Sequence, residues 1–323
     1  MMKALRITKD TAGSAAPSLS VTKVAIPQRT PGSLLVKIYA AAINPSDVLN
    51  ASGGFPHTTF PRIPGRDFAG VIVESDSAEL IGQRVFGTSG NSLSFSQDGA
   101  HAEYCIVTAN SVAPMPGNLT FSQASSIGTP FTTAFIALER AQTTSTDSVL
   151  VLGASGAVGS ATVQLARLKG CKVITAGRSS NTDINTQVDP QLTKVNELTD
   201  GHGVDIVIDT VGDPTLMRAA LDVLAVRGRI SFIAAPRTGS TEGTFDMKNL
   251  YRREASIIGC NSLKYTIDEM GDVLRQLAPS FESGALKTEQ DERLIKVGLG
   301  NDALDAYAKI KSRAGGKYII TVL

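Results

Sequence analysis

The sequence predicts an α/β protein of two domains, one with a doubly wound parallel sheet and the other rich in β-strands. A chain of 323 residues is too long for one ordinary core and suits two domains. In the first 120 residues, short apolar or alternating runs are separated by Gly, Pro and Ser clusters, as in β-strands joined by turns. After Val149, strand patterns alternate with helix patterns, which indicates a parallel sheet covered by helices.

Each element follows from its local pattern. In the β-rich part, the predicted strands lie at 34–41, 68–74, 84–87 and 102–107. The pattern becomes helical from Phe121, and the parallel sheet is predicted from strands at 149–152, 173–175, 204–208, 229–234 and 256–259, with a helix at 214–225. We expect 256–259 at the open edge of this sheet. The tail predicts helices at 266–277 and 302–312 and a strand at 317–322.

The last strand is expected to return to the N-terminal domain, which makes that domain discontinuous. The predicted domains are therefore 1–122 with 266–323, and 123–265.

A glycine turn, Gly153-Ala-Ser-Gly156-Ala-Val-Gly159, stands between the first strand of the parallel sheet and a helical pattern. Glycines in this place let the backbone turn tightly and approach a pyrophosphate at the N-terminus of the helix. A purely structural turn is the alternative. The position between strand and helix favours a dinucleotide site, with contacts expected from Gly153, Ser155, Gly156, Ala157 and Val158.

The end of the second strand favours NADPH over NADH. An NAD site usually has an Asp or Glu there for the ribose 2′-hydroxyl, but this chain has Gly177, Arg178 and Ser179. An Arg with neighbouring hydroxyls would bind a 2′-phosphate, which a carboxylate would repel. A solvated Arg in a loop is the alternative.

Composition excludes some function classes. The net charge of +1 gives no reason to expect nucleic acid or an acidic membrane surface as a partner. No stretch is apolar for the length of a membrane span, and the first ten residues lack a signal-peptide core. Cys105, Cys171 and Cys260 stand far apart in apolar surroundings, so we expect reduced, buried thiols in a cytoplasmic protein.

Several further motifs follow one another along nearly the whole chain. They are Ile43-Asn44-Pro45-Ser46-Asp47, Pro64-Gly65-Arg66-Asp67-Phe68-Ala69-Gly70, Gly99-Ala100-His101-Ala102-Glu103-Tyr104, the run 127–134, Asp209-Thr210-Val211-Gly212, Gly228-Arg229-Ile230 and Gly316-Lys317. With the glycine turn, they resemble the medium-chain dehydrogenase/reductase superfamily, and within it the zinc-free quinone oxidoreductases similar to zeta-crystallin. The resemblance implies a Rossmann NADPH-binding domain, a GroES-like catalytic domain, a small-molecule substrate in the interdomain cleft and a homodimer.

The resemblance also implies site residues. It places Asn44 beside the nicotinamide, although Asn before Pro is also common turn chemistry. Asp47 either orients this loop or faces water. Further cofactor contacts are implied for Thr133, Val211, Ile233, Ala235 and Lys317.

No catalytic zinc is expected. Zinc enzymes of this superfamily need Cys, His and Cys or acidic ligands, but no Cys stands at 44–46 and Arg66 replaces the His. His57, His101 and His202 show no ligand spacing, so each is interpreted as an ordinary loop or strand residue.

One departure concerns proton donation. Relatives commonly have a Tyr where this chain has Phe55, and a phenyl ring can form a pocket wall but has no proton to give. The proton would come from water, or from another group such as Tyr251 or Tyr265. A second departure is the segment 181–190, which lacks the helical pattern usual there.

The sequence thus predicts a zinc-independent, NADPH-dependent reductase of quinones, enones or other α,β-unsaturated carbonyl compounds. Without a Lewis acid, hydride addition to an activated C=C or quinone remains feasible because the substrate's own carbonyl takes the charge. The alternatives are a zinc-free carbonyl or alcohol oxidoreductase, an enoyl-thioester reductase, and a non-catalytic NADPH-binding protein.

Overall fold

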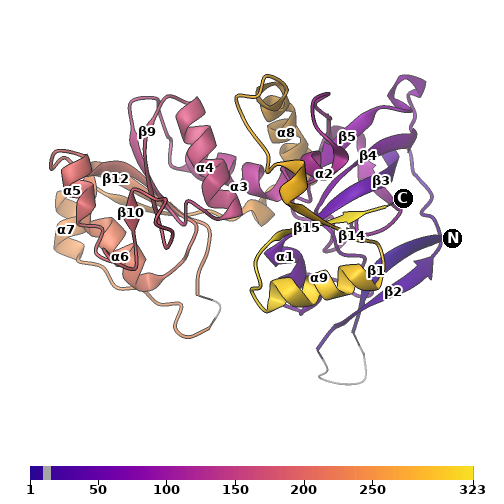
Figure 1. The fold of residues 1–323 in the computed structure, drawn as a ribbon, viewed down its shortest axis with the longest axis horizontal. Helices are drawn as coiled ribbons and strands as arrows, with labels where there is room; N and C mark the ends of the chain where they lie inside the picture. The colour runs from indigo at the N-terminus through magenta and orange to yellow at the C-terminus, as the bar shows by residue number, and fades with distance from the viewer. Residues whose placement is uncertain (10–15, 237, 323) are drawn as a thin grey trace. The chain divides into compact units, whose positions relative to one another are not determined.

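The chain divides into two compact units, seen in a computed structural model that describes residues 1–9, 16–236 and 238–322 (Figure 1). The first unit comprises Met1–Thr132 and Leu263–Leu323. The second unit comprises Thr133–Ser262.

The first unit is built on a seven-stranded sheet in the order β14-β15-β3-β4-β5-β7, with β6 also paired to β3. The strands of this sheet are β3 (Ser33–Ile43), β4 (Asp67–Glu74), β5 (Arg84–Gly87), β6 (Tyr104–Thr108), β7 (Val112–Pro114), β14 (Leu294–Gly298) and β15 (Lys317–Thr321). A separate two-stranded sheet is formed by β1 (Met2–Thr8) and β2 (Ser18–Val24). β15 pairs antiparallel with β3, so the tail of the chain lies within the sheet of the N-terminal part.

Helices and 3₁₀ turns complete this unit, whose apolar core includes Ile38, Phe68 and Ile320. The α-helices are α1 (Pro45–Ala51), α2 (Phe121–Ala124), α8 (Ile267–Glu282) and α9 (Asn301–Lys311), and the 3₁₀ turns are η1 (Ala78–Leu80), η2 (Ala109–Ser111), η3 (Ser262–Lys264) and η4 (Asp291–Arg293). A further helix, α3 (Gly128–Arg140), begins in the first unit and continues into the second.

The second unit contains a six-stranded parallel sheet in the order β10-β9-β8-β11-β12-β13. Its strands are β8 (Ser148–Leu152), β9 (Lys172–Gly177), β10 (Ile184–Asn185), β11 (Val204–Asp209), β12 (Leu224–Phe232) and β13 (Ser256–Gly259). The helices are α4 (Ala157–Leu168), α5 (Lys194–Leu198), α6 (Pro214–Asp222) and α7 (Met247–Arg252). The predicted strand 256–259 is confirmed, and it lies at the edge of the sheet, paired with β12.

Two predictions for this unit need correction. The helix predicted at 214–225 ends at Asp222, because the buried Leu224 and Ala225 begin β12. β12 itself ends at Phe232 rather than at residue 234. The segment after Arg178 contributes the short strand β10, whose preceding residue Asp183 accepts hydrogen bonds from the backbone and hydroxyl of Thr175 (2.8 and 2.7 Å).

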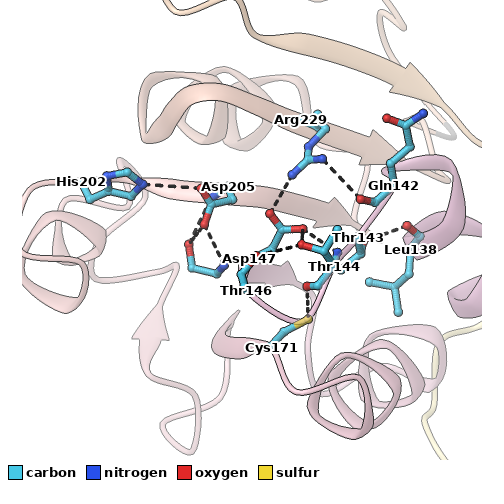
Figure 2. A network of polar contacts seen from close by, with 11 residues as sticks. Leu138, Gln142, Thr143, Thr144, Thr146, Asp147, Cys171, His202, Asp205 and Arg229 are labelled. Carbon is cyan, nitrogen blue, oxygen red and sulfur yellow. Dashed lines mark hydrogen bonds and ion pairs between the residues drawn. The ribbon is translucent and has the colours of Figure 1, made fainter.

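A polar network fixes the N-terminal ends of the parallel strands (Figure 2). Arg229 forms an ion pair with Asp147 (2.8 Å), and Asp147 in turn accepts a hydrogen bond from the Thr144 backbone (2.6 Å). The Cys171 thiol donates to the Thr144 carbonyl (3.2 Å), and the exposed His202 lies 3.5 Å from Asp205. Ligands of such sheets bind at the opposite, carboxyl ends of the strands, so this network is structural.

All three cysteines are buried and unpaired, as predicted. Among the helices of the described ranges, none is both long and apolar enough to cross a bilayer.

Candidate functional site

The glycine turn has the geometry that a bound pyrophosphate requires. β8 ends at Leu152, Gly153 adopts φ +76°, and α4 begins at Ala157. A Cβ on Gly153 would lie 2.6 Å from Thr210 Oγ1, and a Cβ on Gly159 would lie 2.1 Å from the Gly153 carbonyl oxygen. The positive φ and the neighbouring Thr210 side chain therefore favour glycine at 153, and the close approach of the Gly153 backbone requires glycine at 159.

The N-terminus of α4 is open to a ligand. Ser155, Gly156 and Ala157 are exposed, and a Cβ on Gly156 would contact only the Gly153 carbonyl oxygen, at 3.3 Å. The first N–H groups of a helix have no acceptor within it and carry partial positive charge. The turn thus fits the pyrophosphate of a dinucleotide.

The residues predicted to select the cofactor lie at the end of β9. Gly177 is buried, and a Cβ there would be 3.7 Å from Ser155 Oγ, so this strand end borders the glycine turn. Arg178 is exposed and forms no ion pair with any residue of the described ranges. Its guanidinium is therefore available to a phosphate.

The remaining predicted contacts of the second unit also follow strand ends. Val211 comes after β11 and is 44% exposed, while Ile233 and Ala235 come after β12. The ends of these two strands meet, since a Cβ on Gly212 would lie 2.5 Å from the Ala234 backbone. Thr133 differs from these residues because it is buried within α3.

A buried polar cluster in the first unit surrounds Asn44, which precedes α1. The Asn44 side-chain amide donates to Asp67 Oδ2 (2.8 Å), and Asp67 Oδ2 also accepts from the Thr129 backbone (2.8 Å). The other oxygen, Asp67 Oδ1, accepts from the hydroxyls of Thr88 (2.6 Å) and Thr129 (2.7 Å). Asp67 therefore fixes the rotamer of Asn44 from strand β4.

Asp47 belongs to the same cluster and has no exposed surface. Its Oδ2 accepts the Asn44 backbone N–H (2.8 Å), whereas its Oδ1 is enclosed without a hydrogen-bond partner among the described residues. Burial raises the pKa of Asp47 to about 7, although the neighbouring Arg66 opposes this shift. Of the two interpretations of Asp47, orientation of the loop is confirmed and exposure to water is wrong.

Arg66 is the cation of this cluster, with 5% of its surface exposed. Its Nε donates to Ser89 Oγ (2.6 Å) and its Nη1 to Ser46 Oγ (3.0 Å). Burial lowers the pKa of Arg66, while Asp67 and Asp47 raise it, and the guanidinium remains charged at neutral pH.

Both ring nitrogens of His101 form structural hydrogen bonds. Its Nε2 lies 3.1 Å from the Ala42 carbonyl oxygen, which can only accept, so Nε2 carries the proton and Nδ1 accepts from the Tyr307 hydroxyl (2.8 Å). Burial lowers the pKa of His101 to about 4, which keeps the ring neutral. Within the described ranges, no three His, Cys, Asp or Glu side chains are grouped to hold a metal ion.

Phe55 and Lys317, both predicted site residues, have defined neighbours. The partly buried Phe55 ring packs edge-on against Phe95 (5.2 Å between centroids) and His57 (5.7 Å). Lys317 Nζ donates to the Ser126 carbonyl (2.7 Å), and burial lowers the pKa of this amine to about 8. Of the two tyrosines considered as proton donors, Tyr251 is 67% exposed on α7 of the second unit, and Tyr265 is partly buried before α8 of the first.

Sequence reasoning missed the central role of Asp67. A detectable signal was its place at the start of an apolar strand, because a carboxylate there must be buried and therefore hydrogen-bonded. The acceptors of Arg66 were not predictable, since Ser46 and Ser89 are far apart in the sequence.

Comparison with known proteins agrees with both units. Residues 30–117 match the alcohol dehydrogenase GroES-like domain, and residues 157–278 match the zinc-binding dehydrogenase family. A zinc-type alcohol dehydrogenase-like protein of Schizosaccharomyces pombe is 50% identical over 322 residues, covering 100% of this chain and 98% of that protein. The human quinone oxidoreductase is 31% identical over 282 residues, or 82% of each chain.

Among solved structures, an alcohol dehydrogenase superfamily protein from Novosphingobium aromaticivorans superimposes with a TM-score of 0.85 at 28% identity, covering 100% of both chains. The parallel sheet of the second unit is accordingly Rossmann-like, and the first unit contains the GroES-like domain. The chain belongs to the medium-chain dehydrogenase/reductase superfamily of nicotinamide-dependent oxidoreductases and is quinone oxidoreductase-like.

Proposed function

We propose that this protein is a zinc-independent, NADPH-dependent reductase of quinones, enones or related α,β-unsaturated carbonyl compounds. The observation that carries the proposal is the cluster around Asn44, in which an amide and a guanidinium stand where a zinc enzyme needs thiol and imidazole ligands. Arg66 would repel a divalent cation, and both nitrogens of His101 are occupied. The names of the matching family and of the fission-yeast relative refer to zinc, but these side chains do not fit it.

NADPH is supported by the end of β9. Arg178 offers a free guanidinium beside the glycine turn, with no carboxylate in the run 177–180. When bound, the reduced nicotinamide supplies a hydride. The α4 N-terminus would bind the pyrophosphate, and Arg178 with Ser179 would bind the 2′-phosphate.

The polar cluster would act on the nicotinamide side of the reaction. Asp67 holds the Asn44 amide in one rotamer, so the Asn44 side chain needs little further ordering when cofactor and substrate bind. Phe55 provides apolar surface without a proton, so the final proton would come from water, with Tyr251 or Tyr265 as the alternative donor. The open edge of β13, where Ile257 is 37% exposed, supports assembly into a homodimer.

The test is NADPH oxidation by the purified protein with a panel of quinones, enones, enoyl thioesters, aldehydes and, in reverse, alcohols. We expect turnover with quinones and enones. Turnover confined to alcohols and aldehydes would favour a carbonyl or alcohol oxidoreductase, and turnover confined to enoyl thioesters would favour the biosynthetic reductase. NADPH binding without turnover on any substrate would identify a non-catalytic binding protein.

A further inference from the structure

Arg66 is held in place by neutral groups rather than by an ion pair. Its Nε and Nη1 donate to the hydroxyls of Ser89 and Ser46, and no carboxylate of the described residues forms a salt bridge with it. Asp67 and Asp47 act on this charge only through space, so an N–H group that the serines do not use can bind a further acceptor.

The third nitrogen of the Arg66 guanidinium is Nη2, which the two serines do not bind. Nη2 donates no hydrogen bond to any residue in the described part of the chain. Among the described residues, the fully buried polar atoms without a hydrogen-bond partner do not include Nη2. Nη2 therefore reaches the surface, which agrees with the 5% exposure of Arg66. A nearly buried, preoriented N–H donor forms stronger hydrogen bonds than one in bulk water.

Aromatic rings lie beside the same guanidinium. The Arg66 Cζ atom is 5.6 Å from the centroid of the Phe95 ring. Phe95 is fully buried and packs against Phe55 at 5.2 Å and His57 at 4.8 Å, whereas Phe55 is partly exposed and His57 exposed. We call these three rings the aromatic trio; Phe55 and His57 are its accessible members and offer ring surface on which a planar conjugated molecule can stack.

The geometry points to Arg66 as a catalytic hydrogen-bond donor, whose free Nη2–H binds the carbonyl oxygen of a planar enone or quinone stacked on the aromatic trio. This role rests on the proposed function and specifies its electrophilic residue. The charge of the guanidinium takes the place of the Lewis acid that a zinc enzyme would use.

An enone is reduced in two steps, hydride addition and protonation. The β-carbon accepts the hydride from the reduced nicotinamide dinucleotide, which is oxidised, and the C=C electron pair moves toward the carbonyl oxygen. Nη2–H stabilises the resulting enolate without giving up its proton, and a proton from water then adds to the α-carbon. Arg66 is unchanged at the end of the cycle.

The test compares the Arg66→Gln variant with wild type in two measurements. In the first, kcat/KM for an enone and a quinone should fall about 10²- to 10³-fold, as for loss of one oxyanion donor. In the second, benzylideneacetone labelled with ¹³C at its carbonyl is bound in the presence of NADP⁺, which cannot reduce it. Polarisation by Nη2–H should shift the carbonyl resonance downfield in wild type and not in Arg66→Gln.

Arg84→Gln is the matched control, because Arg84 also lies over an aromatic ring of the first unit, that of Phe121 at 4.9 Å. It should leave both measurements unchanged. If Arg66→Gln does not fold, Arg66→Lys replaces it: the lysine keeps the charge but has no Nη2, so a reduced carbonyl shift is still expected.

The proposed function and the proposed role of Arg66 can be refuted independently. Lack of wild-type turnover on the whole panel would overturn the proposed function. Normal wild-type turnover, combined with an unchanged carbonyl shift and kcat/KM in the folded Arg66 variant, would overturn the role of Arg66 alone.

Discussion

The amide of Asn44 donates to the carboxylate of Asp67 across 2.8 Å, which joins the start of α1 to the start of β4. Asp67 also binds Thr129, and a Cβ on the neighbouring Gly128 would lie 2.5 Å from Asp67 Oδ1. The first turn of α3 can approach the carboxylate only because residue 128 is glycine. Asn44, β4 and α3 are thus fixed to one buried carboxylate.

Replacing Asn44 with Ala should lower kcat about tenfold or more on every substrate, because a residue on the shared nicotinamide side loses its anchored amide. The measurement is kcat and KM for one quinone and one enone. Asn118→Ala is the control, since Asn118 is an exposed amide that binds the Phe281 carbonyl of the first unit. If Asn44→Ala leaves both rates untouched, Asn44 is only a turn residue.

Phe55→Tyr should be tolerated, because Phe55 is only partly buried. The added phenol can donate a proton or hydrogen bond, so kcat on enones should rise. The effect on quinones should be small, because their oxygens take protons directly from water. Steady-state kinetics with both substrate classes measure the difference, and equal changes on both would contradict a proton-donating role at this position.

Replacing Arg178 with Ala should weaken NADPH binding by about 1–3 kcal/mol, the range for losing a charge-assisted hydrogen bond, and should barely alter NADH binding. Titration of both cofactors against wild type, Arg178→Ala and Arg252→Ala measures this. Arg252 is an exposed arginine on α7 and serves as the control. Equal affinity of the wild type for NADPH and NADH would rule out the preference.

The purified protein should contain no stoichiometric zinc, since Arg66 and Asn44 stand where the metal ligands would be needed. Elemental analysis checks the metal content, and a strong chelator should leave both activity and Tm unchanged. One tightly held zinc per chain would show the interpretation of this cluster to be wrong.

The sequence predicts the elements of the second unit well because each apolar run of the parallel sheet is bounded by turns or helix signals. The predicted strands 204–208 and 256–259 lie within β11 and β13. The helix predicted at 214–225 is too long because Leu224 and Ala225 suit either a helix or a strand. Pairing of β12 with β11 places them in a strand.

The polar cluster was predictable only in part. Asn44, Arg66 and His101 could be singled out from motifs, but hydrogen bonds between residues 20 to 206 positions apart cannot be read from sequence spacing. The partnership of His101 with Tyr307 depends on α9 packing against the N-terminal sheet, which no local pattern encodes.

Asp47→Asn should become more stable relative to wild type as pH rises. The folded pKa of Asp47 is about 7, above its ordinary value of 3.8, so the folded chain retains a proton that the unfolded chain releases. The contribution of Asp47 to the free energy of unfolding is fully present below pH 3.8 and is lost as the pH rises through 7. An asparagine at this position does not titrate, so the variant loses nothing over this range. The difference in unfolding free energy between the variant and wild type should therefore increase by about 2–3 kcal/mol from pH 5 to 8.

Urea unfolding of both proteins at each pH measures this difference, and the opposite contribution of His101 cancels because it is common to both. Asp183→Asn is the control: burial opposes the shift, but hydrogen bonds from the Thr175 backbone and hydroxyl hold the pKa of Asp183 below its ordinary value. Asp183 is thus ionised at both pH 5 and pH 8, in the folded and the unfolded chain, and its substitution should have the same effect at each. A pH-independent difference for Asp47→Asn would mean that Asp47 is already ionised at pH 5 in the folded protein.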